Sequence, residues 1–197
     1  MDVQLLFPDG LKLSVPVFLL VVKDRLPTAM PQSLQLDGML HQLCGARIDA
    51  VCIGYGDWQV RRCRGKVYAL CVLGEFNRDF VLSWRGEAGL DWPALNMQLH
   101  LNHTKSMGIS LTKLQRAPVT LRLRRGGETL RPHPNAATRT LKNLLQEHNI
   151  PPWYRDRLPL LYCGEELVSV PGVAIAAEYL ADGHEAAIRL ELQGADR

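Results

Sequence analysis

The sequence predicts an α+β protein: a helix plus β-meander domain, followed by a small β-rich C-terminal domain that carries one or two helices. Three observations predict this fold class. Residues 31–46 repeat apolar side chains at helical spacing, and residues 49–72 alternate in short runs that turn residues separate. Beyond residue 118, strand-like runs surround one further helical stretch.

The first helix is expected over Pro31–Ala46. Its Leu36, Met39, Leu40 and Leu43 follow the i, i+3, i+4, i+7 pattern that places apolar side chains on one helical face. A serine stands ahead of this stripe and a glycine behind it, as helix-capping residues do.

The β-meander is expected over Asp49–Ile53, Trp58–Arg62 and Lys66–Val72, with turns at GYGD and CRG. A turn has no core to bury, so cations placed there are expected to face solvent or a partner. Four cations gather at the second turn: Arg61, Arg62, Arg64 and Lys66.

The C-terminal domain is expected to open with a strand in which apolar and polar residues alternate over residues 119–124, before Gly126-Gly127 turns the chain. A helix follows that Thr138 or Thr140 caps and that Pro151 and Pro152 end, and Pro152 can open a second short helix. The core face of the first helix is expected to hold Leu141, Leu144, Leu145 and His148. Strands are expected in 158–162, 166–172 and 186–193, with a turn at CGEE.

The domain boundary is expected between Ser106 and Ala117. The organisation that follows has an unassigned N-terminal segment (1–30), a first domain (31–92), an irregular connection (93–117) and a C-terminal domain (118–197). The apolar run Leu13–Val22 has ten residues, which are too few to cross a membrane. A soluble protein in the cytoplasm, without membrane contact, is therefore expected.

Charge is unevenly distributed along the 197 residues, although the net charge is only +3. Val119–Arg157 holds eight Arg/Lys and three Asp/Glu, whereas the chain from Gly164 onward holds two Arg and seven Asp/Glu. A basic block beside an acidic stretch suggests a face directed at a polyanion. A solvated surface with no partner is the equally weighted alternative.

No catalytic, cofactor or metal site is predicted within the sequence. Five cysteines without a C-x-x-C indicate buried thiols in a reducing compartment, and His100 and His103 lack further metal ligands nearby. The glycine-rich loops that bind nucleotide phosphates are missing, as is G-x-S-x-G. Adjacent residues of a strand point to opposite faces, so Glu165 and Glu166 are not expected to share a proton-transfer site.

The basic block supplies the candidates for polyanion binding. Arg139 and Lys142 are expected at the start of a helix, where unpaired backbone N–H groups also favour phosphate. Trp153 and Tyr154 are expected either to stack on a base or to anchor the core, with the second favoured. The candidate cations of this domain are Arg124, Arg125, Arg131, Arg139, Lys142 and Arg155.

Three stretches resemble the C-terminal domain of bacterial tRNA(Ile)-lysidine synthetase: LRRGGETLRP, RTLKNLLQEHNIPPWYRDRLPLLY and ELVSVPG. The family pattern runs Arg-x-Gly-Gly-Glu, Arg-Pro, Ser/Thr-Leu-Lys-x-Leu-Leu-Gln-Glu, Pro-Pro-Trp-x-Arg, Pro-Leu-Leu and Val-Pro-Gly. Nearly every part stands in this order between Arg124 and Gly172. Upstream, LDGMLHQLCGARIDAVCIGYGDWQVRRCRGKVYAL is similar to the family's central substrate-binding domain, where a helix precedes strands carrying a Trp and an Arg-x-Arg-Gly.

The resemblance implies a partner and a reaction for the family enzyme. That enzyme uses ATP to adenylate C2 of the wobble cytidine in an AUA-reading isoleucine tRNA, and lysine then attacks to give lysidine. Its central and C-terminal domains hold the tRNA, which makes 31–92 and 118–197 the tRNA-binding parts here. The family's ATP-binding pyrophosphate loop has no counterpart in residues 1–32, so a separate ATP-binding catalytic domain is an expected partner and no cofactor is expected on this chain.

Three hypotheses stay open at this point. The first is a tRNA-recognition portion of tRNA(Ile)-lysidine synthetase that is inactive alone. The second is a structural or protein-interaction remnant without RNA affinity. The third is an active ligase with an unrecognised site.

Overall fold

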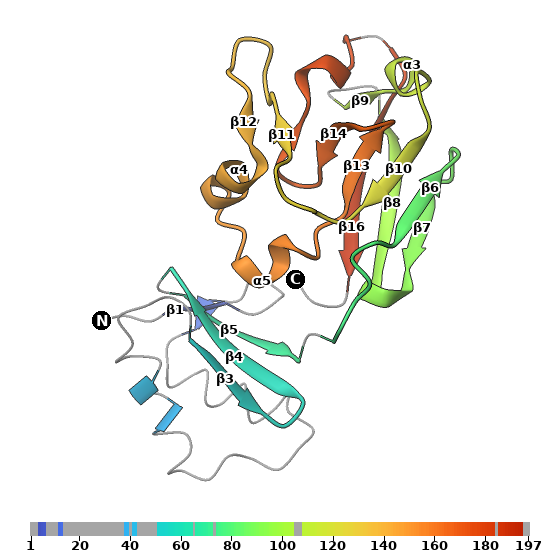
Figure 1. Ribbon diagram of the computed structural model, residues 1–197. Coiled ribbons are helices and arrows are strands. Elements are labelled where there is room, and N and C mark those ends of the chain that lie inside the picture. The colour runs from blue at the N-terminus through green and yellow to red at the C-terminus, as the bar shows by residue number, and fades with distance from the viewer. Residues whose placement is uncertain are drawn as a thin grey trace. The chain divides into compact units, whose positions relative to one another are not determined.

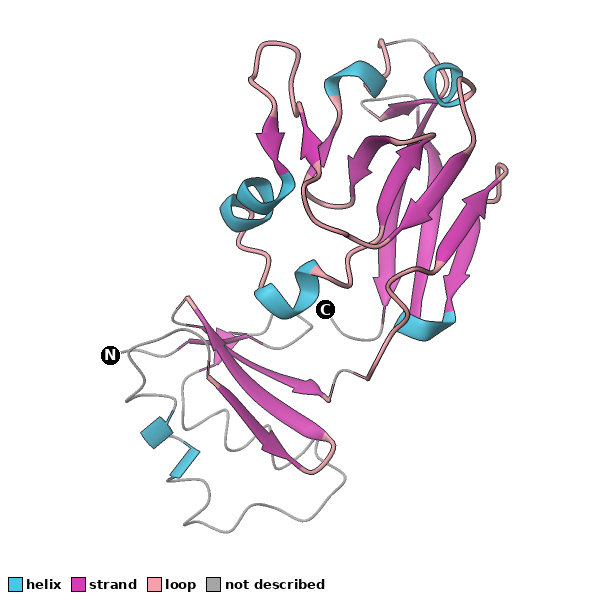
Figure 2. Ribbon diagram, viewed as in Figure 1, coloured by secondary structure: helices cyan, strands magenta, loops and turns pink. Residues whose placement is uncertain are grey.

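The computed structural model describes residues 4–6, 12–13, 38–39, 41–42, 51–64, 66–72, 74–104, 108–183 and 185–194. The chain divides into two compact units, an N-terminal unit within Met1–Glu75 and a C-terminal unit, Phe76–Ala195. Strands far outnumber helices among the described residues, which confirms the predicted fold class (Figure 2). None of the helices in the described part is long and apolar enough to span a membrane.

The N-terminal unit is built on one five-stranded sheet of order β2-β1-β5-β4-β3. The predicted meander forms its antiparallel part, since β4 pairs with both β3 and β5. The strand β1 adds in parallel beside β5, with Leu5 opposite Val67. The strands are β1 (Gln4–Leu6), β2 (Lys12–Leu13), β3 (Cys52–Tyr55), β4 (Trp58–Cys63) and β5 (Lys66–Cys71).

The predicted helix over Pro31–Ala46 is only partly within the described residues. Gly38, Met39, His41 and Gln42 are helical, and the other positions lie outside the described part of the chain. The segment 1–30, unassigned from sequence, contributes β1 and β2 to the sheet. The buried segment expected at Leu13–Val22 lies almost wholly outside the described residues.

The C-terminal unit contains two main sheets, of order β15-β14-β13-β10-β6 and β7-β8-β16-β9, which face each other in Figure 1. The long antiparallel pair β8 and β16 runs through the second sheet with a continuous register from Ala187–Thr104 to Gly194–Met97. The strands of the first sheet are β6 (Val81–Trp84), β10 (Val119–Arg122), β13 (Leu160–Cys163), β14 (Glu166–Val170) and β15 (Ala174–Ile175). Those of the second are β7 (Gly89–Trp92), β8 (Met97–Thr104), β9 (Ile109–Ser110) and β16 (Ala187–Gly194).

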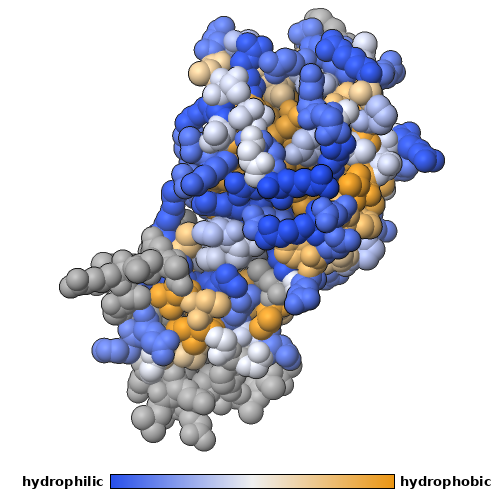
Figure 3. All heavy atoms as spheres, viewed as in Figure 1, coloured by the Kyte–Doolittle hydropathy of each residue, from blue (hydrophilic) through white to orange (hydrophobic). Residues whose placement is uncertain are grey.

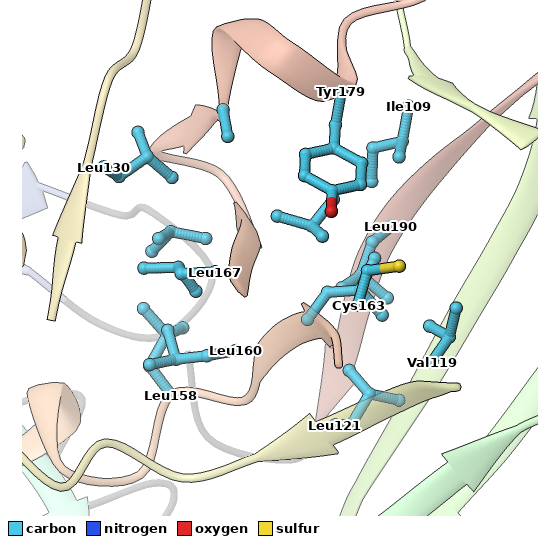
Figure 4. Packing of buried hydrophobic residues seen from close by; sticks show 14 of the residues in the cluster. Ile109, Val119, Leu121, Leu130, Leu158, Leu160, Cys163, Leu167, Tyr179 and Leu190 are labelled. Carbon is cyan, nitrogen blue, oxygen red and sulfur yellow. The ribbon is translucent and has the colours of Figure 1, made fainter. Parts of the chain in front are cut away.

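The core of this unit lies where inward-facing side chains of the two sheets meet. Leu121 and Cys163 come from the first sheet and Leu190 from the second, and Figure 4 shows them in one cluster. Burial alternates along β10, where Val119 and Leu121 are buried and Thr120 and Arg122 are half-buried. The hydrophobic effect across this interface therefore holds the two sheets together.

The helices of the C-terminal unit begin and end where local signals place them. In α4 (Leu141–Glu147) the Thr140 hydroxyl accepts a hydrogen bond from the Asn143 amide, so Thr140 is the N-cap. Pro151 and Pro152 precede and open α5 (Pro152–Arg155) as predicted. The face of α4 buries Leu141, Leu144 and Leu145, whereas His148 is exposed at the C-cap, in contrast to its expected place on the core face. The remaining helices are α3 (Leu111–Leu114), η1 (Pro93–Leu95) and η2 (Ala177–Tyr179).

The unit boundary lies earlier than the sequence indicated. The C-terminal unit begins at Phe76, whereas the first domain was expected to extend to 92 and the boundary to fall between 106 and 117. Residues 93–117 were expected to be an irregular connection with one strand in Pro93–His103; β8 confirms that strand, and the range also contains β9 and α3. The strands β6 and β7 are edge strands of the two sheets. Their apolar and polar residues alternate only weakly, so the sequence did not predict them as strands.

Candidate nucleic-acid interface

The β4–β5 turn positions the four predicted RNA-binding cations of the N-terminal unit. Arg64 is exposed and adopts a left-handed φ of 50°, as the tight turn after β4 requires. The Arg61 guanidinium donates two hydrogen bonds to Gln59 Oε1, at 2.9 and 3.1 Å. Arg61 and Arg62 are neighbours on one strand and therefore face opposite sides of the sheet. The turn thus spreads its cations over two faces, and Lys66 begins β5 directly across from Cys63.

The arginines beside the Gly-Gly turn meet carboxylates from other segments. Arg124 lies 3.6 Å from Glu128 and 3.8 Å from Asp156, measured between nitrogen and oxygen atoms. Arg125 lies 3.3 Å from Asp79, a residue from the start of the unit. Both cations predicted to bind phosphate at this turn therefore already have anionic partners.

The same pairing recurs at the two-stranded sheet formed by β11 (Thr129–Leu130) and β12 (Arg139–Thr140). Arg131 donates a hydrogen bond from Nε to Glu178 Oε1 at 2.9 Å, and its Nη2 lies 2.8 Å from the same oxygen in an ion pair. The Arg139 guanidinium reaches both carboxylate oxygens of Glu147, at the far end of α4. Arg139 therefore points away from the helix N-terminus, where sequence reasoning expected it to act.

Two cations of the block differ from the paired arginines. Arg155 donates from Nε to the Ile150 carbonyl at 2.8 Å, which ties α5 to the preceding loop. Lys142 is exposed on the first turn of α4. Of the six predicted cations in the C-terminal unit, Lys142 alone has no ion pair or side-chain hydrogen bond among the described residues.

Sequence reasoning missed the carboxylates that reach the block from distant segments. Arg122 pairs with Glu165 at 2.9 Å, and its guanidinium lies 5.0 Å above the Tyr162 ring. This pairing lowers the pKa of Glu165, because Arg122 donates hydrogen bonds to its carboxylate. Asp79, Glu165 and Glu178 all lie outside Val119–Arg157, so the local charge count overstated the free positive charge. The face seen in Figure 3 accordingly shows a broadly hydrophilic C-terminal unit.

The Arg-Arg-Gly-Gly-Glu sequence forms a turn that its own glutamate closes. Gly126 and Gly127 both have positive φ, at 98° and 85°, a conformation that strains other residues. The Glu128 Oε1 accepts hydrogen bonds from the backbone amides of Arg125 and Gly126, at 2.6 and 2.8 Å. The motif therefore fixes the direction in which the chain leaves β10 for β11.

A cavity of about 490 Å³ lies beside this turn and has an acidic wall. Its lining includes Glu128, Glu165, Glu166 and Glu178, and Arg131 is the one cation among the described residues that line it. The Tyr179 hydroxyl donates to Glu166 at 2.6 Å, and burial with this hydrogen bond raises the pKa of Tyr179. A wall of this charge repels phosphate, so the cavity is not the predicted polyanion site.

The described residues hold no arrangement typical of a metal or catalytic centre. No group of three or more His, Cys, Asp or Glu among them could hold a metal ion. His100 and His103 are three residues apart on β8 and therefore face opposite sides of the sheet. Cys52, Cys63, Cys71 and Cys163 form no disulfide among the described residues, and Cys44 lies outside them.

Comparison with known proteins identifies the part of the chain that carries the motifs. Residues 119–192 match the model of the TilS substrate C-terminal domain. This part of the chain belongs to that domain family. The range contains all six predicted cations of the C-terminal unit, whereas the β4–β5 turn lies outside it.

Several tRNA(Ile)-lysidine synthases are similar to a longer part of the chain. The protein of Coxiella burnetii is 35% identical over 165 residues, which are 83% of this chain and 36% of that protein. The proteins of Nitrosomonas europaea and Legionella pneumophila (strain Lens) are 33% and 32% identical, over 76% and 75% of this chain and 33% of each relative. The chain therefore spans about a third of the length of these relatives, and the resemblance seen in its motifs is confirmed.

The solved structures that are similar to this chain include one of a related domain. It is described as the crystal structure of the TILS C-terminal domain and has a TM-score of 0.43 and 21% identity. The similarity covers 52% of this chain and 87% of that one.

Proposed function

We propose that this chain is a tRNA-recognition portion of tRNA(Ile)-lysidine synthase. The observation that carries the proposal is the match of residues 119–192 to the TilS substrate C-terminal domain, because this range holds the whole basic block. In this role the two units bind folded RNA through its phosphates and 2′-hydroxyls, which rigid small domains with arginines recognise by shape. Such a protein acts in the cytoplasm, where its tRNA is found.

The reaction itself belongs to the complete family enzyme. ATP and lysine are its substrates, and a separate ATP-binding catalytic domain is the second expected partner of this chain. No phosphate-binding loop occurs in this sequence, so the chain alone is expected to bind tRNA(Ile) without forming lysidine.

The paired arginines favour a second candidate function. Because Arg125, Arg131 and Arg139 each have a carboxylate partner, the basic block can serve as a structural ion-pair network. A structural or protein-interaction role without RNA affinity would follow. Paired arginines still keep further N–H donors, however, since a guanidinium has five and Arg131 contacts Glu178 through only two of its nitrogens.

Binding of tRNA at different salt concentrations distinguishes the two functions. Fluorescence anisotropy with labelled AUA-reading isoleucine tRNA should give an affinity that falls linearly on a log–log plot as salt rises, because phosphate contacts release counterions. A second tRNA and a DNA duplex serve as controls for shape recognition. If the chain binds none of these nucleic acids at low salt, the RNA-binding function is excluded.

A further inference from the structure

The segment Phe76–Asp79, here called the strap, opens the C-terminal unit ahead of β6 and is held by side chains. Its recorded backbone contacts are local: the Asp79 amide donates to Asn77 Oδ1 at 2.9 Å, and the Phe80 amide donates to the Asn77 carbonyl at 3.4 Å. Among the described residues, no backbone hydrogen bond joins the strap to either sheet. Its attachment to the unit therefore depends on side-chain contacts.

The first set of these contacts is made with the residues that follow α5. Arg78 Nη2 lies 2.9 Å from Asp156 Oδ2. The Arg157 guanidinium stacks over the Phe76 ring, 4.3 Å from its centroid. Asp156 also faces Arg124 at 3.8 Å, so one carboxylate joins the strap to the Arg-Arg-Gly-Gly-Glu turn.

The second set attaches the end of the strap. Asp79 Oδ1 lies 3.3 Å from Arg125 Nη2, at that same turn. The next residue, Phe80, packs on the fully buried Trp92 with 5.3 Å between ring centroids. The strap is therefore anchored in the core at Phe80 and held by charge over the residues before it.

The charged contacts of the strap are weak because water reaches them. The side chains of Arg78 and Asp156 are 61% and 42% exposed, and those of Arg125 and Asp79 are 63% and 83% exposed. Ion pairs this exposed change an equilibrium constant by only about two- to fivefold, and salt screens them. Apolar burial holds Phe80 independently of salt.

We propose that the strap is an electrostatic latch, released when a phosphate backbone takes the arginines that hold it. Arg125 and Arg157 are its holding cations, and both would bind RNA phosphates as readily as the strap. The inference rests on the proposed function for the identity of this polyanion. Release frees four residues, which span about 13 Å at most when fully extended. RNA binding would in this way increase the length that the segment connecting the two units can span.

The latch can be tested with salt alone, on the full chain and without RNA. The aromatic ring current of Phe76 shifts the NMR signals of the Arg157 side chain while the latch is closed. Raising salt from about 50 mM to about 500 mM should reduce this shift, because the Debye length falls to a few ångströms and the ion pairs that hold the strap are screened. Signals of the core residue Leu99 should not move.

Variants confined to the strap make the test independent of salt. Asp79→Asn and Arg78→Gln each remove one ion pair and should lower the ratio of closed to open strap about two- to fivefold. Glu178→Gln is the matched control, because it breaks an exposed ion pair with Arg131 elsewhere in the same unit and should leave the Arg157 signals unchanged. A strap that keeps the full ring-current shift in both strap variants and at high salt would overturn the latch.

A tRNA titration then tests the coupling. Binding of tRNA that removes the Arg157 shift at low salt supports the proposal, and binding that leaves the shift intact overturns it. If tRNA does not bind, the proposed function fails and release by RNA fails with it, while the salt and variant results still decide whether the strap is electrostatically held. The two failures are therefore distinguishable.

Discussion

The carboxylate of Glu128 accepts a hydrogen bond from the backbone amide of Gly126, at 2.8 Å, and closes the turn that Gly126 and Gly127 make. Its other partner, the Arg125 amide, lies 2.6 Å away, and the Glu128 side chain is only 8% exposed. Charged acceptors of this kind contribute more than neutral ones, because the carboxylate charge strengthens each hydrogen bond.

Glu128→Ala should therefore destabilise the C-terminal unit by about 2–3 kcal/mol. The change leaves two amides without their acceptor and Arg124 without its nearest carboxylate. Urea unfolding followed by circular dichroism measures the loss. Glu128→Gln keeps one acceptor oxygen and should lose about half as much, whereas equal stability of all three proteins would show that the turn does not need its carboxylate.

A pair of substitutions on α4 tests whether carboxylates restrain the basic block. Glu147→Gln releases Arg139 and removes a negative charge, so tRNA affinity should rise and the salt slope should steepen by about one unit. Lys142→Ala should flatten the slope by about one unit, because Lys142 has no partner to replace its charge. Lys142→Arg keeps the charge and serves as the control in the same anisotropy assay. Unchanged affinity and slope in both charge variants would identify the block as an ordinary solvated surface.

The contrast between α4 and its surrounding charges shows what the sequence could predict. The cap at Thr140 and the stop at Pro151 depend on residues within a few positions of the helix, so local pattern was sufficient. The partner of Arg125 is Asp79, and the partner of Arg131 is Glu178, each more than forty positions away. A local charge count cannot include such partners, because only the fold brings them together.

Strand prediction failed for a related reason at β6 and β7. The residues of β6 alternate between exposed and half-buried, because an edge strand covers little core. The central strands β10 and β14, in contrast, bury enough apolar side chains to be recognised. Residues 76–92 were therefore assigned to the first domain, although the contacts place them in the C-terminal unit.

Tyr162 should make the C-terminal unit sensitive to alkaline pH. Burial, with a smaller contribution from Glu128, raises the pKa of Tyr162 from 10.0 to about 12. The folded state then holds this proton more tightly than the unfolded state. The resulting stability is fully present below about pH 10 and is lost as the pH rises toward 12. Tyr162→Phe should flatten the fall in melting temperature over this range, and an unaltered alkaline profile would contradict the assignment.

Trp153 is the last residue for which the sequence left two roles open. The structure places it half-buried, with its indole nitrogen shielded from solvent and its ring 6.1 Å from that of Tyr154. A half-buried indole contributes apolar area to the fold, so Trp153→Ala should destabilise the C-terminal unit by about 2–4 kcal/mol. Its tRNA affinity, corrected for the folded fraction, should stay at the original value, and Trp153→Phe should recover most of the stability. Thermal unfolding and anisotropy on the same preparations separate the two roles. A fall in affinity with an unchanged melting temperature would instead show that the ring stacks on RNA.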